Sequence, residues 1–233
     1  MMRQNMADDR LGIMVLNGWA ASPDAWNLCG FMRKPAPDGH LPSLHSYVEQ
    51  LDGIPERHFE EGGRFVVVGW SMGGSSALRL FCRYPDQIAG LVLVAATPRM
   101  MEDAVTGWKG MSPRRLEVLR RGLELTHGQG FFGIPEGKPN PYMTDSPENL
   151  ERGLRYLRET DLRRELELKS RAGCAFPVHI FQSASDGIVR SSNAEYLKRI
   201  FPCAKSTIID GGEHALPIFV PERIDAAVSA VLP

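Results

Sequence analysis

Two hydrophobic patterns follow one another along the chain. Short continuous apolar runs are typical of strands buried on both faces of a parallel sheet. Segments with apolar residues at helical spacing follow several of these runs, and strand, helix, strand in that order predicts a right-handed βαβ unit. The pattern therefore predicts an α/β fold with a mostly parallel central sheet flanked by helices. The apolar runs are 11–16, 65–68, 88–96, 176–181 and 206–209, and helical patterns cover 43–51, 191–200 and 221–232.

One long segment breaks this alternation. Residues 97–173 are charged and helical in pattern and contain no strand-like run. They follow a predicted strand at the carboxyl edge of the sheet, where open α/β sheets place their ligand crevices. We therefore expect a core formed by 1–96 and 174–233, with 97–173 inserted as a helical cap over that edge. The alternative is a helical extension that packs elsewhere.

Composition limits the possible partners. The 233 residues are 43% hydrophobic, enough for one substantial α/β core, and the net charge of −1 gives no polybasic signature for nucleic acid or a membrane surface. The four cysteines are scattered without a C-x-x-C pair, which argues against a disulfide framework or a zinc site. Residues 1–10 lack the apolar run of a secretion signal. We expect a cytoplasmic protein whose first ten residues are a frayed lead-in.

The strongest chemical motif is the G-x-S-x-G at Gly69–Gly73, centred on Ser71. An apolar run precedes it and a helical pattern follows it, which is the context of a nucleophile elbow. In such a turn glycines flank the serine because side chains there would collide with neighbouring backbone. A glycine-rich turn with an incidental serine is the alternative, which this context disfavours.

A serine hydroxyl needs a neighbouring base, and a carboxylate that fixes the tautomer of that base. After an elbow serine, the carboxylate and then the histidine follow along the chain. His214 fits, because it follows the last predicted strand in a loop of small residues. The other histidines precede Ser71 (His40, His45, His58), lie in the predicted cap (His127), or sit inside a predicted strand (His179).

Asp186 is the predicted carboxylate. It follows the run 176–181 in a loop at the same sheet edge as Ser71 and His214. Asp210 competes, but it lies so close to His214 in sequence that capping of a turn explains it better. Asp161 lies in the predicted cap, where pairing with Arg163 or Arg164, or helix capping, is the simpler role.

The tetrahedral intermediate of acyl transfer also needs two hydrogen-bond donors for its oxyanion. The backbone N–H of Met72, directly after the nucleophile, is one predicted donor. The second is expected in the loop after the first strand, where Gly18 permits a turn and Trp19 offers its N–H. Trp19 is alternatively a pocket wall or a core aromatic. This chemistry requires no metal and no organic cofactor.

Several motifs together resemble the α/β-hydrolase superfamily: Asn17-Gly-Trp19, GWSMGG around Ser71, Ser185-Asp-Gly-Ile-Val189 and Gly-Glu-His214-Ala. More narrowly, the chain resembles biotin-pathway esterases that cleave pimeloyl-acyl-carrier-protein methyl ester, through Trp19, the elbow tryptophan Trp70 and the cap motifs TPRM, WKGM and ETDLR. The resemblance implies Ser71 as nucleophile, Asp186 and His214 as its relay, and Trp19 and Met72 as oxyanion and substrate-contact positions.

Two departures from the family pattern stand out. Asn17-Gly18 replaces the customary His-Gly, which is expected to leave the backbone donor intact. The usual strand between the oxyanion loop and the elbow is compressed into the proline-rich segment Arg33–Pro42, which predicts a sheet one strand shorter on that side.

Positive charge gathers in the predicted cap. Lys109–Arg121 contains five cations against Glu117 alone, a net charge of +4. Because an acyl carrier protein is acidic, a basic cap would steer it toward the site. The candidate docking residues are Arg114, Arg115, Arg120 and Arg121. The alternative is a solvated helix balanced by Glu124, Glu148 and Glu151.

The sequence therefore predicts a serine carboxylesterase without cofactors. The resemblance points to a methyl ester carried on acyl carrier protein as substrate, with the carrier as partner. A promiscuous short-chain esterase, or another acyl hydrolase of the superfamily, is the nearest alternative. A ligand-binding relative without catalysis is a further alternative, which the intact Ser71, Asp186 and His214 set disfavours.

Overall fold

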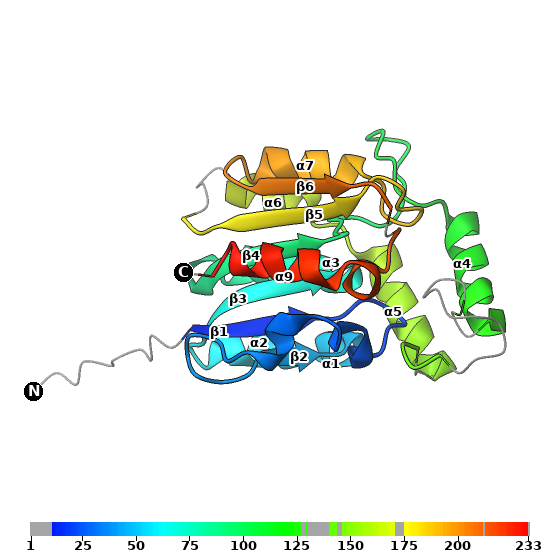
Figure 1. Ribbon diagram of the computed structural model, residues 1–233. Helices are drawn as coiled ribbons and strands as arrows, with labels where there is room; N and C mark the ends of the chain where they lie inside the picture. Colours follow the sequence, from blue (N-terminus) through cyan, green and yellow to red (C-terminus); the bar gives the residue numbers. More distant parts are fainter. Residues whose placement is uncertain are drawn as a thin grey trace, which may run out of the picture.

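The central sheet has six strands, all paired in parallel, in the order β2-β1-β3-β4-β5-β6 (Figure 1). The computed structural model describes residues 11–126, 129, 140–143, 146–170, 175–211 and 213–232. The predicted lead-in at 1–10 and the predicted cap boundary at 173–174 lie outside these residues. The predicted α/β fold with its parallel sheet is confirmed. The strands are β1 Leu11–Leu16, β2 Ser43–His45, β3 Arg64–Trp70, β4 Ile88–Val94, β5 Val178–Ser183 and β6 Lys205–Ile209.

Helices cover both faces of the sheet because successive strand residues point to opposite sides. Ile13 and Val15 of β1 pack toward the short helices η1 and η2 and toward α8 and α9, while Met14 and Leu16 pack toward α2, α3, α6 and α7. Both faces of the sheet are therefore apolar and are buried under helices. On the first face lie η1 Pro23–Trp26, η2 Gly30–Arg33, α8 Leu216–Phe219 and α9 Pro221–Ser229. On the second face lie α2 Ile54–Glu60, α3 Met72–Arg83, α6 Arg163–Ser170 and α7 Ser192–Ile200. The short helix η3, Pro85–Gln87, connects α3 to β4.

The segment 43–51 differs from its predicted single helix. Its first residues form the edge strand β2, and the helix α1 (Tyr47–Leu51) begins only after Ser46. The Ser46 side chain accepts from the N–H of Glu49 while the Glu49 carboxylate accepts from the N–H of Ser46, a reciprocal cap that starts a helix at this point. The predicted loss of a strand on this side is therefore wrong. The strand is present, shortened to three residues directly after the proline-rich segment.

The helices α4 (Pro113–Thr126) and α5 (Pro147–Glu159) lie between β4 and β5 in sequence and beyond the carboxyl ends of the strands in space (Figure 1). Their apolar residues, among them Leu116 and Leu154, form a third buried cluster with Trp19 and Met72. The helix α6 instead packs on the sheet face through Leu166. The division into core and cap at residues 97 and 173 stays a prediction. We call residues 97–170 the cap segment.

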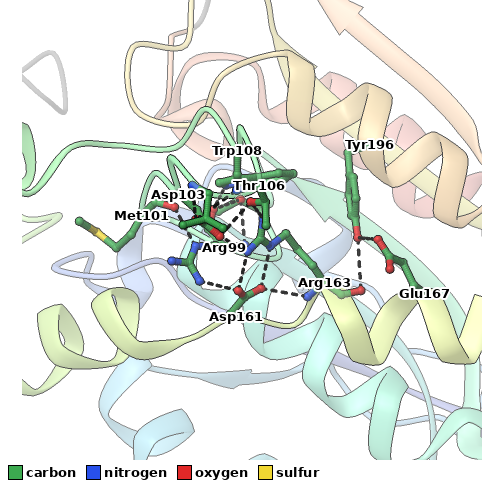
Figure 2. Close-up of polar contacts among 11 residues, drawn as sticks. Arg99, Met101, Asp103, Thr106, Trp108, Asp161, Arg163, Glu167 and Tyr196 are labelled. Atoms are coloured by element: carbon green, nitrogen blue, oxygen red, sulfur yellow. Dashed lines mark hydrogen bonds and ion pairs between the residues drawn. The ribbon is translucent and has the colours of Figure 1, made fainter.

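A polar cluster ties the two ends of the cap segment together (Figure 2). Arg99, just after β4, forms an ion pair with Asp161, just before α6. Asp161 also binds Arg163, as its sequence context predicted, and Arg163 continues to Asp103 at 2.8 Å. The hydrogen bonds from Arg163 lower the pKa of Asp161 to about 2. The backbone joins here too, since Leu162 N donates to Pro98 O at 3.0 Å.

Candidate active site

Ser71 occupies a sharp turn between β3 and α3, as its motif predicts. Its φ of 57° is in the left-handed region that non-glycine residues rarely adopt. Gly69 and Gly73 make the turn possible: a Cβ on Gly69 would lie 2.4 Å from Gly73 O, and one on Gly73 would lie 2.1 Å from Leu16 O. The motif glycines are therefore required by close backbone contacts, and the strained turn places the Ser71 side chain at the carboxyl edge of the sheet.

The structure brings the three predicted side chains into one chain of hydrogen bonds. His214 Nε2 lies 2.8 Å from Ser71 Oγ, and His214 Nδ1 lies 2.8 Å from Asp186 Oδ2. All three residues are buried. An ionised carboxylate only accepts, so Nδ1–H of His214 donates to Asp186. The Nε2 atom is then free of hydrogen and accepts from the Ser71 hydroxyl, the tautomer that a general base requires.

Asp186 is held from several sides. Its Oδ1 accepts from the backbone N–H groups of Ile188 and Val189 at 2.8 and 2.9 Å, and its Oδ2 accepts from Gln182 Nε2 at 3.0 Å. The Gln182 amide is buried at the end of β5. These donors fix the carboxylate plane that orients His214. Sequence reasoning missed Gln182, because nothing in a strand pattern shows which polar residue faces a site.

Trp70, the tryptophan of the elbow, contributes a second unforeseen contact. Its indole Nε1 donates to the backbone O of His214 at 2.9 Å, and the side chain is buried. The elbow and the histidine loop are thus bonded through backbone as well as through Ser71. This contact holds the His214 backbone close to the turn that carries Ser71.

The two predicted oxyanion positions lie on adjoining elements. Met72 is the first residue of α3, where backbone N–H groups have no intrahelical acceptor. Trp19 lies in the loop after β1, which packs directly on the start of α3 where Gly73 has no side chain. In the described part of the chain no hydrogen bond uses the backbone N–H of Met72 or Trp19. The Trp19 indole is engaged separately, donating to Leu150 O of α5 at 2.9 Å.

An apolar cavity lies over Ser71 and His214. Among the described residues that line it, the side chains other than Ser71, His214 and Trp19 are those of leucine, isoleucine and methionine, and most of the lining comes from the cap segment. A second cavity of about 300 Å³ adjoins it, sharing Leu119, Ile188 and His214, and carries Arg115 and Glu213. The first cavity is lined, apart from Ser71 and His214, by Trp19, Met100, Leu116, Leu119, Leu123, Leu157 and Ile188.

The predicted basic helix is less cationic than its sequence suggests. Arg120 forms ion pairs with Glu117 and Glu124, and Arg121 pairs with Glu117. The hydrogen bonds from Arg120 and Arg121 lower the pKa of Glu117 to about 2. Arg115 Nη2 donates to Gly187 O at 2.7 Å, beside Asp186.

Arg114 differs from these three arginines. It is exposed, and among the described residues its side chain forms neither an ion pair nor a hydrogen bond, whereas Arg115 binds Gly187 O and the other two bind glutamates. The charge that α4 offers to a partner is therefore concentrated at its amino-terminal end.

A fold and a site of this kind define a class of hydrolase, and comparison with known proteins agrees. A profile of the alpha/beta hydrolase family matches residues 14–227. The chain belongs to the alpha/beta hydrolase family and is a hydrolase of that family, which confirms the sequence prediction.

Proteins of similar sequence are named pimeloyl-[acyl-carrier protein] methyl ester esterase. One from Nitrosomonas europaea is 26% identical over 249 residues, covering 94% of each chain. Another from Aromatoleum aromaticum is 28% identical over 254 residues, covering 94% of this chain and 96% of the relative. A third, from Edwardsiella ictaluri, is 28% identical over 245 residues and covers 93% and 91%. The predicted resemblance to this group is confirmed.

Solved structures agree on the fold. An esterase from Exiguobacterium antarcticum aligns with a TM-score of 0.70 at 17% identity, covering 95% of this chain and 90% of the other. A bromoperoxidase from Bacillus anthracis aligns with a TM-score of 0.71 at 18% identity, covering 96% and 91%. Because proteins with different named activities align equally well, the shared fold does not select a substrate. Among the described residues no helix combines the length and apolarity needed to span a bilayer.

Proposed function

We propose that the protein is a serine carboxylesterase. The observation that carries the proposal is the hydrogen-bonded chain from Ser71 through His214 to Asp186, buried beneath an apolar cavity. Ser71 Oγ attacks the ester carbonyl carbon while His214 Nε2 takes its proton, and the protonated imidazole is stabilised by Asp186. His214 then gives the proton to the departing alkoxide, which leaves as an alcohol. Water, activated by the same nitrogen, releases the acid from Ser71.

The negative oxygen of the tetrahedral intermediate is held, in this proposal, by the backbone N–H groups of Met72 and Trp19. The amino-terminal end of α3 adds a favourable dipole at the same place. Both amides adjoin the turn that carries Ser71.

We propose a methyl ester of a pimeloyl chain on acyl carrier protein as the substrate. The names of the relatives point to this ester. The apolar lining suits a chain of methylene groups ending in a neutral ester. Arg114 and Arg115, at the start of α4, are the proposed contacts for an acidic carrier, with Arg120 and Arg121 in a lesser role because glutamates neutralise them. The free thiols of Cys29, Cys82 and Cys203 fit the cytoplasm, which we propose as the location.

A promiscuous short-chain esterase is the second candidate. The ion pairs of Arg120 and Arg121 favour it, since they leave α4 with less free positive charge for a carrier.

The two candidates separate when hydrolysis of the carrier-linked methyl ester is compared with hydrolysis of a small ester. Arg114→Glu is expected to lower kcat/KM for the carrier-linked ester about tenfold and leave p-nitrophenyl butyrate unaffected. Arg57→Glu makes the same charge change on α2, which lies apart from α4, and serves as the control (Figure 1). Equal effects of Arg114→Glu on both esters would favour the short-chain esterase.

A further inference from the structure

The loop that carries Trp19 is built around one buried asparagine. Asn17 directly follows β1 and is fully buried, although asparagine is usually exposed. Both polar atoms of its side-chain amide are hydrogen-bonded: Nδ2 donates to Ala21 O at 2.6 Å, and Oδ1 accepts from the indole of Trp26 at 3.1 Å. The Asn17 side chain thus spans the loop from its first residue to Ala21.

The backbone of Asn17 is fixed just as closely. Its N–H donates to His45 O at 3.0 Å, and its carbonyl oxygen accepts from Gln50 Nε2 at 3.0 Å. The same Gln50 nitrogen donates to His45 O at 3.1 Å. Two carbonyl acceptors require the NH₂ end of the Gln50 amide to point toward them, and this leaves Gln50 Oε1 without a partner among the described groups. The amide of Gln50 therefore binds the Asn17 carbonyl although its own buried oxygen is left unsatisfied.

The loop between Asn17 and Ala21 is strained. Ala20 has a φ of 61°, a left-handed value that alanine rarely adopts, and Ala21 N donates back to Gly18 O at 3.4 Å to close a tight turn. Such a conformation persists only when the surroundings determine it. The hydrogen bond from Asn17 Nδ2 to Ala21 O fixes the residue directly after Ala20 and so supports this conformation.

The loop packs directly on the amino-terminal end of α3. A Cβ on Gly73 would lie 2.7 Å from Asn17 O, so the Asn17 carbonyl rests against the residue that follows Met72. The position of Asn17 relative to α3 therefore sets the position of the Trp19 amide relative to the Met72 amide.

We infer that Asn17 is a positioning residue for the oxyanion site: it acts through the loop to hold the Trp19 N–H where the tetrahedral intermediate needs it, with Gln50 as its backbone support. This inference rests on the proposed esterase function. Asn17 touches no reacting atom, and its effect is expected on the transition state and not on ground-state binding.

The test compares steady-state hydrolysis of p-nitrophenyl butyrate by the wild type, Asn17→Ala and Asn193→Ala. Asn193 is the matched control, a buried asparagine whose side-chain amide is also hydrogen-bonded through both polar atoms, accepting from Thr97 Oγ1 at 2.6 Å and donating to Arg190 O at 3.0 Å. Asn17→Ala is expected to lower kcat roughly tenfold to a hundredfold with little change in KM, because small misplacements of catalytic groups cost rates of that order. Asn193→Ala is expected to lower the Tm while kcat stays at the wild-type level.

A trifluoromethyl ketone gives the second readout, because its adduct with Ser71 carries an oxyanion. Its inhibition constant is expected to rise in Asn17→Ala by the same factor by which kcat/KM falls. Gln50→Met, which removes the support of the Asn17 carbonyl at similar side-chain size, is the second variant and is expected to lower kcat in the same sense.

Unchanged kcat and inhibitor affinity in folded Asn17→Ala would overturn the inference. If Asn17→Ala does not fold, the same result in Gln50→Met overturns it. If the wild type hydrolyses p-nitrophenyl butyrate and Ser71→Ala does not, the esterase function stands whatever the Asn17 and Gln50 variants do. Wild-type protein without such turnover would remove the proposed function, and the inference with it.

Discussion

His214 lies with its Nε2 atom 2.8 Å from the hydroxyl oxygen of Ser71, although 143 positions of sequence separate them. The parallel sheet explains this proximity. Ser71 follows β3 and His214 follows β6, and all strands end at the same edge. Asp186, after β5, joins them there, so residues from three strand ends form one hydrogen-bonded chain.

Replacing Asp186 by asparagine is expected to lower kcat on the order of 10⁴-fold with the fold intact. The two backbone N–H groups at Oδ1 would orient the amide oxygen toward themselves, which turns the new NH₂ group toward His214 Nδ1. His214 would then accept at Nδ1 and carry its hydrogen at Nε2, where it could no longer take the Ser71 proton.

Asp210→Asn is the matched control for this measurement, because Asp210 is the other aspartate near His214 in sequence. It is exposed and is expected to leave kcat for p-nitrophenyl butyrate unchanged. A greater loss in Asp210→Asn than in Asp186→Asn would contradict the assignment of Asp186.

The contact between α5 and Trp19 depends on Gly153. A Cβ at this position would lie 2.3 Å from Trp19 Cδ1, so Gly153→Ala must push the helix or the indole away and weaken the bond from Trp19 Nε1 to Leu150 O. We expect a loss of about 1–3 kcal/mol in the free energy of unfolding, measured with urea.

Gly122→Ala is the control for the glycine substitution. Gly122 lies in α4 with nothing within 4 Å of an added Cβ, and alanine there is expected to stabilise the protein by about 0.5–1 kcal/mol. Equal stability changes in both variants would show that the packing on Trp19 is unimportant.

The polar cluster that joins the ends of the cap segment is expected to make part of the free energy of unfolding sensitive to acid (Figure 2). Arg163 holds the pKa of Asp161 at about 2, below its usual 3.8. A carboxyl group whose folded pKa is lowered contributes stability that is complete above its unfolded pKa and is lost as the pH falls toward 2. Unfolding free energies measured between pH 5 and about pH 2 should therefore fall less steeply in Asp161→Asn than in the wild type. Equal slopes would count against this role.

The sheet could be predicted well because its signal is local. The run at Leu11–Leu16 coincides with β1, and the helix at Ser191–Ile200 begins within a residue of α7. The edge strand β2 was missed because its three residues, Ser43–His45, continue into the apolar spacing of the following helix. Only the cap formed by Ser46 and Glu49 separates the two elements.

The site was less evenly predictable. Chain order and strand-end position were enough to predict that Asp186 and His214 lie beside Ser71, because a parallel sheet brings such loops together. Gln182 and the role of Asn17 were not foreseeable, since each acts through contacts with residues distant in sequence. The charge of α4 was overestimated because the partners of Arg120, at helical spacing on the same face, neutralise it.

The most direct test of the central claim is hydrolysis of p-nitrophenyl butyrate by Ser71→Ala beside the wild type, with thermal unfolding of both proteins as the check on folding. The account predicts turnover by the wild type and none above the uncatalysed rate by Ser71→Ala, at closely similar Tm. Hydrolysis by Ser71→Ala at the wild-type rate would contradict it, because the ester would then be cleaved without the Ser71 hydroxyl.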